Sequence, residues 1–299
     1  MRIQCPYSEC LGDHSRPFSE RLIRRGTFKR KSDSERIPRF ICRACGRWFS
    51  SSHLLPTFLQ KKRKLNRPLL KLLNSGVSQR RAARFLGISR QTVERKFKFL
   101  AEQARISQNR YQEKWRKTPL TEVQFDDLET SEHSKCKPLS VALAVDPKTR
   151  KILSFQVSQM PCKGRLAHVA RLKYGYRKDE RSLGWTRLFS ALRDLVHDQS
   201  SFLSDENPHY PRHLKSQFPN ACHETVKGGR GCIAGQGELK KLHFDPLFSL
   251  NHTCAMMRAN MNRLFRRTWC TTKKREGLID HLSLYVDFHN RVLTEKSAA

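Results

Sequence analysis

"TEVQFDDLETSEHSKCKPLSVALAVDPKTRKILSFQVS" covers residues 121–158 and decides the fold. Residues 121–130 alternate in polarity as a β-strand does, with acidic residues clustered at its end. Residues 137–158 read as two apolar strands joined by the turn "DPKTRK" around Pro147. The stretch therefore predicts a sheet that begins with three antiparallel strands.

The residues that follow predict helices and one further strand. Residues 185–198 have a helical pattern, and residues 200–211 read as a short strand that ends in Asp205. A short helix over 212–218, a longer one over 247–270 and a closing amphipathic one over 278–293 complete the order. Three strands, a helix, a strand and a helix predict a mixed-sheet α/β domain of the ribonuclease-H-like kind over residues 119–299.

Two acidic residues follow apolar strand residues at equivalent points of this pattern. Asp126 follows Phe125 on the first strand, and Asp205 ends the fourth. In a fold of this order the two strands lie side by side, so the two carboxylates converge. Carboxylates are the ligands that Mg²⁺ prefers, and paired ions can clamp the oxygens of a phosphoryl transfer. Strand-end acids are also common on surfaces, and Asp127 competes with Asp126 because a one-residue slip changes the face.

Two pairs of cysteines near the start predict a zinc site. Their spacing, with a long basic arm between the pairs, is the layout of a four-cysteine zinc ribbon over residues 1–58. Phe40 and Phe49 are expected to pack beside the metal, and Gly46 suits the tight turn. The first pair is spaced more widely than usual, so His14 is an alternative ligand. The predicted zinc ligands are Cys5, Cys10, Cys42 and Cys45.

Residues 76–100 predict a helix-turn-helix within a helical DNA-binding domain over 59–118. Ser78 and Ser89 are suited to cap two helices, and Gly87 separates them. An apolar stripe of Ala82, Ala83, Phe85 and Leu86 is expected on the first helix, and Val93, Phe97 and Leu100 on the second. An all-α hairpin with solvated charges has a similar pattern. The exposed face of the second helix would read DNA with Arg90, Gln91, Thr92 and Arg95.

The overall charge favours a nucleic-acid partner. The 299 residues carry 59 Lys and Arg against 27 Asp and Glu, a formal net charge of +32. Such an excess needs an anionic partner, and DNA or RNA is the leading one. No apolar run is long enough to cross a bilayer and no signal peptide opens the sequence, so we expect a cytoplasmic protein without membrane contact. Ten cysteines in such a compartment favour metal ligands or free thiols over disulfides.

The order of zinc ribbon, helix-turn-helix and ribonuclease-H-like body resembles insertion-sequence transposases of the DDE class, along nearly the whole chain. "VQFDDLET" is similar to their first-Asp strand, "FLSDENPHY" to their second-Asp strand with its Tyr, and "AMMRANMNRLFRRTW" to their Arg-rich helix. The resemblance implies metal-dependent cleavage and strand transfer at transposon ends, by a homo-oligomer on DNA. It also implies that one helix carries the phosphate-contacting Arg258, Arg263, Arg266 and Arg267, with Leu264, Phe265 and Trp269 in the core.

The third metal ligand departs from the family. Its Glu would fall at Asn251, whose neutral carbonyl can bind Mg²⁺ or Mn²⁺ without adding charge. Glu238 is the alternative, in a segment that reads as a loop. His252 could orient a phosphate or make a structural hydrogen bond. Two other functions remain open: a DNA-binding regulator with an inactive body, and an RNA-binding zinc protein.

Overall fold

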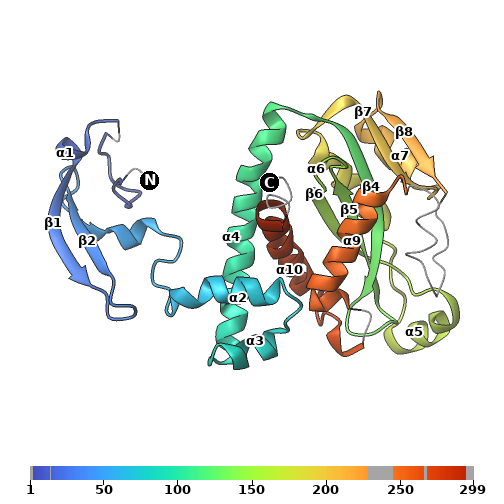
Figure 1. Ribbon diagram of the computed structural model, residues 1–299, viewed down its shortest axis with the longest axis horizontal. Coiled ribbons are helices and arrows are strands. Elements are labelled where there is room, and N and C mark those ends of the chain that lie inside the picture. The colour runs from blue at the N-terminus through green and yellow to red at the C-terminus, as the bar shows by residue number, and fades with distance from the viewer. Residues whose placement is uncertain (1–2, 14, 228–244, 266–267, 294–299) are drawn as a thin grey trace. The chain divides into compact units, whose positions relative to one another are not determined.

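The computed structural model describes residues 3–13, 15–227, 245–265 and 268–293 (Figure 1). The chain divides into two compact units, Met1–Pro68 and Leu69–Ala299. The helical segment and the large sheet lie in the same unit, although the sequence predicts separate domains over 59–118 and 119–299. Both units contain a sheet, which confirms the mixed α/β class.

The first unit is built on a three-stranded antiparallel sheet in the order β1-β2-β3. Phe40 and Phe49 are buried with their ring centroids 5.5 Å apart, and they share a core cluster with Cys5 and Cys42. This confirms the packing predicted beside the cysteines. The elements are α1 (Phe18–Arg21), β1 (Leu22–Lys29), β2 (Arg36–Cys42), β3 (Trp48–Ser50) and the 3₁₀ turns Ser51–Leu54 and Arg63–Leu65.

The second unit contains a five-stranded mixed sheet in the order β6-β5-β4-β7-β8. The first three strands in the chain pair antiparallel, as predicted, whereas β4, β7 and β8 are parallel. The strand β8 was not foreseen from the sequence. The strands are β4 (Leu120–Ser131), β5 (Pro138–Val145), β6 (Ile152–Gln159), β7 (Val196–Asp205) and β8 (Cys222–Val226).

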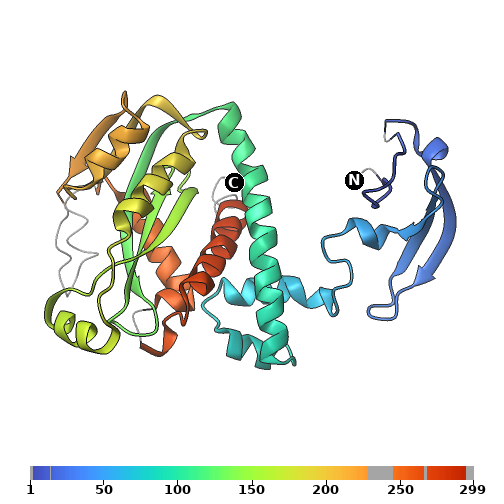
Figure 2. The same ribbon diagram turned by 180° about the vertical axis from the view of Figure 1, so that it is seen from behind.

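Helices cover both faces of this sheet, because its central strands alternate between two cores. Helices α6 (Arg181–Leu192) and α7 (Tyr210–Gln217) pack with Phe125 and Phe202 on one face (Figure 2). Helices α9 (Phe248–Asn260) and α10 (Arg275–Phe288) pack with Leu143 on the other. Helix α5 (Ala167–Tyr174) lies in the connection between β6 and α6, and a π-helical turn over His289–Leu293 follows α10.

The helix-turn-helix joins this body through one long helix. Helices α2 (Asn66–Leu73) and α3 (Gln79–Phe85) pack against the first half of α4 (Arg90–Lys117), together with Leu284 of α10. The second half of α4 places Tyr111 and Trp115 in the core of the sheet. In the part of the chain that the structure describes, no helix combines the length and apolarity needed to cross a bilayer.

Several element boundaries differ from those predicted. Residues 185–198 are not one helix, because α6 ends at Leu192 and β7 begins at Val196. The helix predicted over 247–270 ends at Asn260, and Trp269 is 76% exposed instead of part of the core. Phe85 is 61% exposed and lies under the Arg81 guanidinium, outside the apolar stripe.

Candidate metal centre and active site

The four predicted zinc ligands come together in the first unit. The Sγ atoms of Cys5, Cys10, Cys42 and Cys45 all lie within 4.8 Å of one another. The Cys5–Cys45 Sγ distance is 3.7 Å and the Cys10–Cys42 distance is 3.6 Å. Tetrahedral zinc with Zn–S bonds of about 2.3 Å needs sulfur atoms roughly 3.8 Å apart. The cluster therefore fits a metal such as Zn²⁺.

The backbone around Cys42 favours its thiolate, whereas burial raises the pKa of Cys5 to about 12. Burial opposes ionisation of Cys42, but hydrogen bonds from the backbone N–H groups of Cys45 and Ala44 lower its pKa to about 7. A left-handed φ of +68° at Gly46 forms the turn that presents these N–H groups. The alternative ligand His14 lies outside the described residues.

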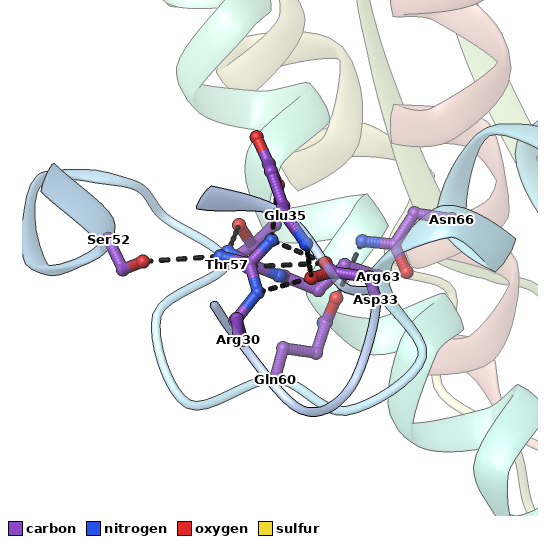
Figure 3. Close-up of polar contacts among 8 residues, drawn as sticks. All are labelled: Arg30, Asp33, Glu35, Ser52, Thr57, Gln60, Arg63 and Asn66. Atoms are coloured by element: carbon purple, nitrogen blue, oxygen red, sulfur yellow. Dashed lines mark hydrogen bonds and ion pairs between the residues drawn. The ribbon is translucent and has the colours of Figure 1, made fainter. Parts of the chain in front are cut away.

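A partly buried polar cluster ties the segment after β3 to the β1–β2 hairpin of the first unit (Figure 3). The Arg30 guanidinium donates to the Asp33 and Glu35 carboxylates, and the Arg63 guanidinium approaches Asp33 at 3.6 Å. The Asp33 side chain is only 8% exposed and that of Arg63 11%. Arg63 belongs to a run of four basic residues over 61–64, and its contact with Asp33 gives it a structural role. Three more contacts complete the cluster: Arg30 to Ser52, Arg63 to Thr57, and Asn66 to Gln60.

The helix-turn-helix has the predicted caps. The Ser78 hydroxyl accepts from the Arg81 N–H at 3.3 Å, and the Ser89 hydroxyl accepts from the Thr92 N–H at 3.2 Å. Between them Gly87 adopts a φ of +59°, which suits glycine. Of the predicted DNA-reading residues, three are exposed at the start of α4, and Thr92 is half-buried with its hydroxyl 2.9 Å from that of Ser89. The exposed ones are Arg90, Gln91 and Arg95.

Asp126 and Asp205 lie on neighbouring strands, as predicted, and these two strands are parallel. The pairing of β4 with β7 sets Gln124 opposite Leu203. Two residues further along each strand come Asp126 and Asp205, at the same level and on the same face of the sheet. The two carboxylates therefore project from the carboxyl end of the parallel pair.

Burial and neighbouring acids raise the pKa of Asp126. Burial raises the pKa of Asp126 to about 7, and the charges of Asp205 and Asp127 add to this rise. Hydrogen bonds from the Asp127 N–H, at 2.6 Å, and the Tyr210 hydroxyl, at 3.3 Å, act in the opposite direction. Tyr210 is itself buried, and its pKa is raised by burial and by the same three carboxylates. A cation at this point would relieve the repulsion between the acids.

Asp127 has a different role from Asp126. Its carboxylate accepts hydrogen bonds from the indole N–H of Trp185, at 2.9 and 3.1 Å. Trp185 belongs to the core between the sheet and α6. Asp127 is therefore held on the opposite face of β4, which favours Asp126 as the ligand.

Helix α9 begins beside these acids because Gln124 anchors it. The Gln124 amide donates to the Pro246 carbonyl at 2.8 Å and accepts from the Leu250 N–H at 3.0 Å. One turn later, burial and the charge of Asp126 raise the pKa of Cys254 to about 12. Cys254 thus lies within electrostatic range of Asp126.

The predicted third ligand lies on the exposed start of α9. The Asn251 amide donates to Asp245 at 2.9 Å, which leaves its carbonyl oxygen for another contact. Within the described residues, the four cysteines are the one group of three or more His, Cys, Asp or Glu side chains close enough to share an ion. The alternative ligand Glu238 lies outside the described residues. The His252 ring lies 5.6 Å from that of Phe248 in a tilted arrangement, and burial lowers the pKa of His252.

Only some of the four arginines predicted to contact phosphates are placed to do so. Arg258 follows Cys254 on α9 and is half-buried. Arg263 lies beyond the helix, where its guanidinium packs 5.6 Å from the centre of the Phe97 ring and donates to Thr272. This inward placement argues against the predicted phosphate contact of Arg263. Arg266 and Arg267 lie outside the described residues.

Sequence reasoning missed three contributors to the site: Gln124, Trp185 and Cys254. Each acts across a long sequence separation, so no local motif marks it. One signal was present for Gln124, because a polar residue between the buried residues Val123 and Phe125 needs a hydrogen-bonding partner.

No protein-family model matches the chain, and no curated protein has a significant sequence match. The function therefore has to be argued from the sites themselves.

Proposed function

We propose that the chain is a DNA transposase of the DDE class, which binds the ends of an insertion sequence and catalyses metal-dependent strand cleavage and strand transfer. The observation that carries the proposal is the parallel pairing of β4 and β7, which brings Asp126 and Asp205 to one end and one face of the sheet. Two acids in that position suit the metal-assisted displacement that the resemblance to transposases implies.

The rest of the architecture supports the same function. The strand order, with β4 between an antiparallel and a parallel neighbour, supports the proposed ribonuclease-H-like arrangement. A capped helix-turn-helix with exposed Arg90 and Gln91 suits the major groove of DNA. The net charge of +32 suits binding to a polyanion.

The residues fit a divalent cation at the sheet end. Asp126 and Asp205 would hold Mg²⁺ or Mn²⁺, with the carbonyl oxygen of Asn251 as a neutral third ligand. The bound ion would activate the attacking oxygen and stabilise the charge that develops on the phosphate. Tyr210 positions the Asp126 carboxylate through its hydroxyl, and Gln124 holds the start of α9 in place.

The test compares the full-length protein with two variants on DNA that carries the flanking ends of its own coding segment. Asp126→Asn removes a carboxylate from the site. Asp198→Asn makes the same change at an exposed position of the neighbouring strand β7. We expect Mg²⁺- or Mn²⁺-dependent nicking to fall at least 100-fold in the first variant, in the range that lost catalytic electrostatics cost, and to persist in the second. Binding to the same DNA should persist in both.

A second function, a DNA-binding regulator with an inactive body, is favoured by one feature. Asn251 brings no charge to the third position, and its amide donates to Asp245. If the wild-type protein binds those ends but never nicks them with Mg²⁺ or Mn²⁺, its function is that of a DNA-binding regulator. An RNA-binding role would instead give tight RNA binding with no preference for terminal sequences.

A further inference from the structure

A cavity of about 440 Å³ lies along the free edge of β6, and its lining does not include Asp126 or Asp205. Its floor is formed by residues 155–158 of this strand. Helices α4, α6 and α10 supply its walls, through side chains that include Arg105, Arg187 and Arg275. We call it the β6 cavity.

The hydrogen bonds of β6 show which peptide groups face this cavity. The Met160 N–H donates to the Pro138 carbonyl, so the neighbouring pair Gln159 and Leu139 is of the non-hydrogen-bonded kind. Because such pairs alternate along an antiparallel ladder, Val157 and Phe155 have the same orientation. The N–H and C=O groups of Phe155 and Val157 therefore point out of the sheet, into the β6 cavity.

Other groups cover the edge on both sides of this opening. The Leu153 carbonyl accepts from the Gln112 amide at 3.0 Å, and the Gln159 carbonyl accepts from the Glu180 N–H at 3.0 Å. Among the residues that the structure describes, none hydrogen-bonds to the outward peptide groups of Phe155 and Val157. The open stretch between the two covered carbonyls is about 20 Å long, enough for a strand of about five residues.

Arginine side chains outnumber acidic ones among the residues that line the cavity. Three arginines, Arg105, Arg187 and Arg275, face one acid, Glu180. Arg275 pairs with Glu180 at 2.8 Å, and Arg105 pairs with Asp280 and Glu102. The exposed Arg187 is the cation best placed to receive a further anion.

We propose that the β6 cavity is a docking site for an extended acidic segment of a partner protein, which adds a strand to the edge of the sheet at Phe155 and Val157. Main-chain hydrogen bonds would give affinity in such an addition, and the charged walls would select acidic side chains. The unpaired peptide groups favour a peptide over a nucleic acid, whose phosphates need cations but no strand edge. This function is separate from DNA cleavage.

The test uses the full-length protein and a fluorescein-labelled peptide, Ac-Glu-Val-Glu-Val-Glu-Val-amide, in fluorescence anisotropy at physiological salt. Two further peptides carry N-methyl groups, either on the valine amides or on the glutamate amides. All three have the same charge, but a docked strand uses the N–H groups of alternate residues only. We expect one methylated peptide to lose binding by about tenfold or more, equivalent to about 1.4 kcal/mol, and the other to keep it.

Two protein variants test separately the main-chain hydrogen bonds at the strand edge and the charge of the cavity. Val157→Pro removes an outward N–H without breaking the ladder to β5, a position where edge strands tolerate proline. Arg187→Glu reverses a charge of the cavity, and Arg171→Glu makes the same change on the exposed face of α5 as its control. We expect the first two variants to weaken peptide binding and the control to leave it unchanged, with unfolding midpoints measured for all three.

The proposal is overturned if both methylated peptides bind as tightly as the parent, because binding is then electrostatic alone. It is also overturned if a short oligothymidylate displaces the peptide and loses affinity in Arg187→Glu, which would identify a nucleic-acid surface. Neither result bears on the cleavage test with Asp126→Asn.

Discussion

Asp126 and Asp127 are neighbours in the sequence but have different surroundings. The first faces Asp205 and the start of α9, whereas the second is fixed by the Trp185 indole. The sequence predicted the acidic pair at 126 and 205 because strand-end acids are a local pattern. It did not predict Gln124 or Cys254, because their roles depend on α9 crossing β4 more than a hundred residues later.

Adding a charge at Asn251 tests the proposed third ligand. Asn251→Asp places a carboxylate where the structure has an amide, beside Asp245. We expect Mn²⁺ to bind about tenfold more tightly, since hard cations prefer charged oxygen ligands, as measured by isothermal titration calorimetry. Asn220→Asp, the same change at an exposed residue, is the control. Unchanged affinity in Asn251→Asp would exclude this residue as a ligand.

The buried His281 makes the second unit sensitive to acid. Burial, with the charge of Arg263, lowers the pKa of His281 to about 3, and its Nε2 donates to the Leu73 carbonyl. The folded protein therefore prefers the neutral ring, so stability is full above about pH 6.5 and falls as the pH drops toward 3.

We expect His281 to cost the fold about 2 kcal/mol between pH 6.5 and pH 5. Denaturant unfolding at both pH values measures this loss. His281→Gln keeps a donor for Leu73 but does not titrate, so its stability should change less over the same interval. An equal loss in both proteins would assign the acid sensitivity to other groups.

For helices and strands, the sequence predicted the type of an element better than its length. Helix α4 continues to Lys117 because no proline or glycine interrupts residues 90–117, and its last turns are stabilised by core contacts of Tyr111 and Trp115. Val196 fits a helix or a strand equally well in isolation, and pairing with Leu120 of β4 decides for the strand.

The contact between α6 and β6 gives a prediction at this scale. A Cβ atom on Gly184 would lie 2.1 Å from the Ser158 hydroxyl oxygen. We expect Gly184→Ala to destabilise the protein by about 1–3 kcal/mol, as overpacking does. Ser158→Ala should recover much of this loss in the double variant, so the four proteins form a thermodynamic cycle with clear coupling. Additive effects would show that the two elements do not meet there.

The whole molecule consists of two units with different sources of stability. The first depends on a small core around Phe40 and on its cysteine cluster, whereas the second has a large two-sided core. Cysteine spacing made the cysteine cluster predictable from the sequence. The division at Pro68 was not predictable, because it depends on how α4 packs against the sheet.

Removal of metal should therefore unfold the first unit alone. We expect a chelator, or Cys42→Ser, to open residues 1–68 to proteolysis, because structural zinc contributes on the order of 10 kcal/mol to such folds. Thermal unfolding of the second unit should stay the same. Elemental analysis should give one zinc per chain in the wild type and in Cys222→Ser, an exposed cysteine outside the cluster. Full protease resistance after chelation would contradict this.

Helix α4 has a consequence for where DNA is cut. Its 28 residues form a rod about 42 Å long, with Gln91 in the first turn and Trp115 in the last turn, where it packs in the same core as Phe125 of the strand that carries Asp126. A rigid helix of this kind keeps the DNA-reading residues at a fixed distance from the acids of the sheet. In the proposed transposase the protein therefore sets the distance from the recognised base to the broken bond, about 12 base pairs at 3.4 Å each. Extra nucleotides inserted within that distance should change the sequence at which the DNA is cut. The number of base pairs between the recognised base and the cut should stay constant.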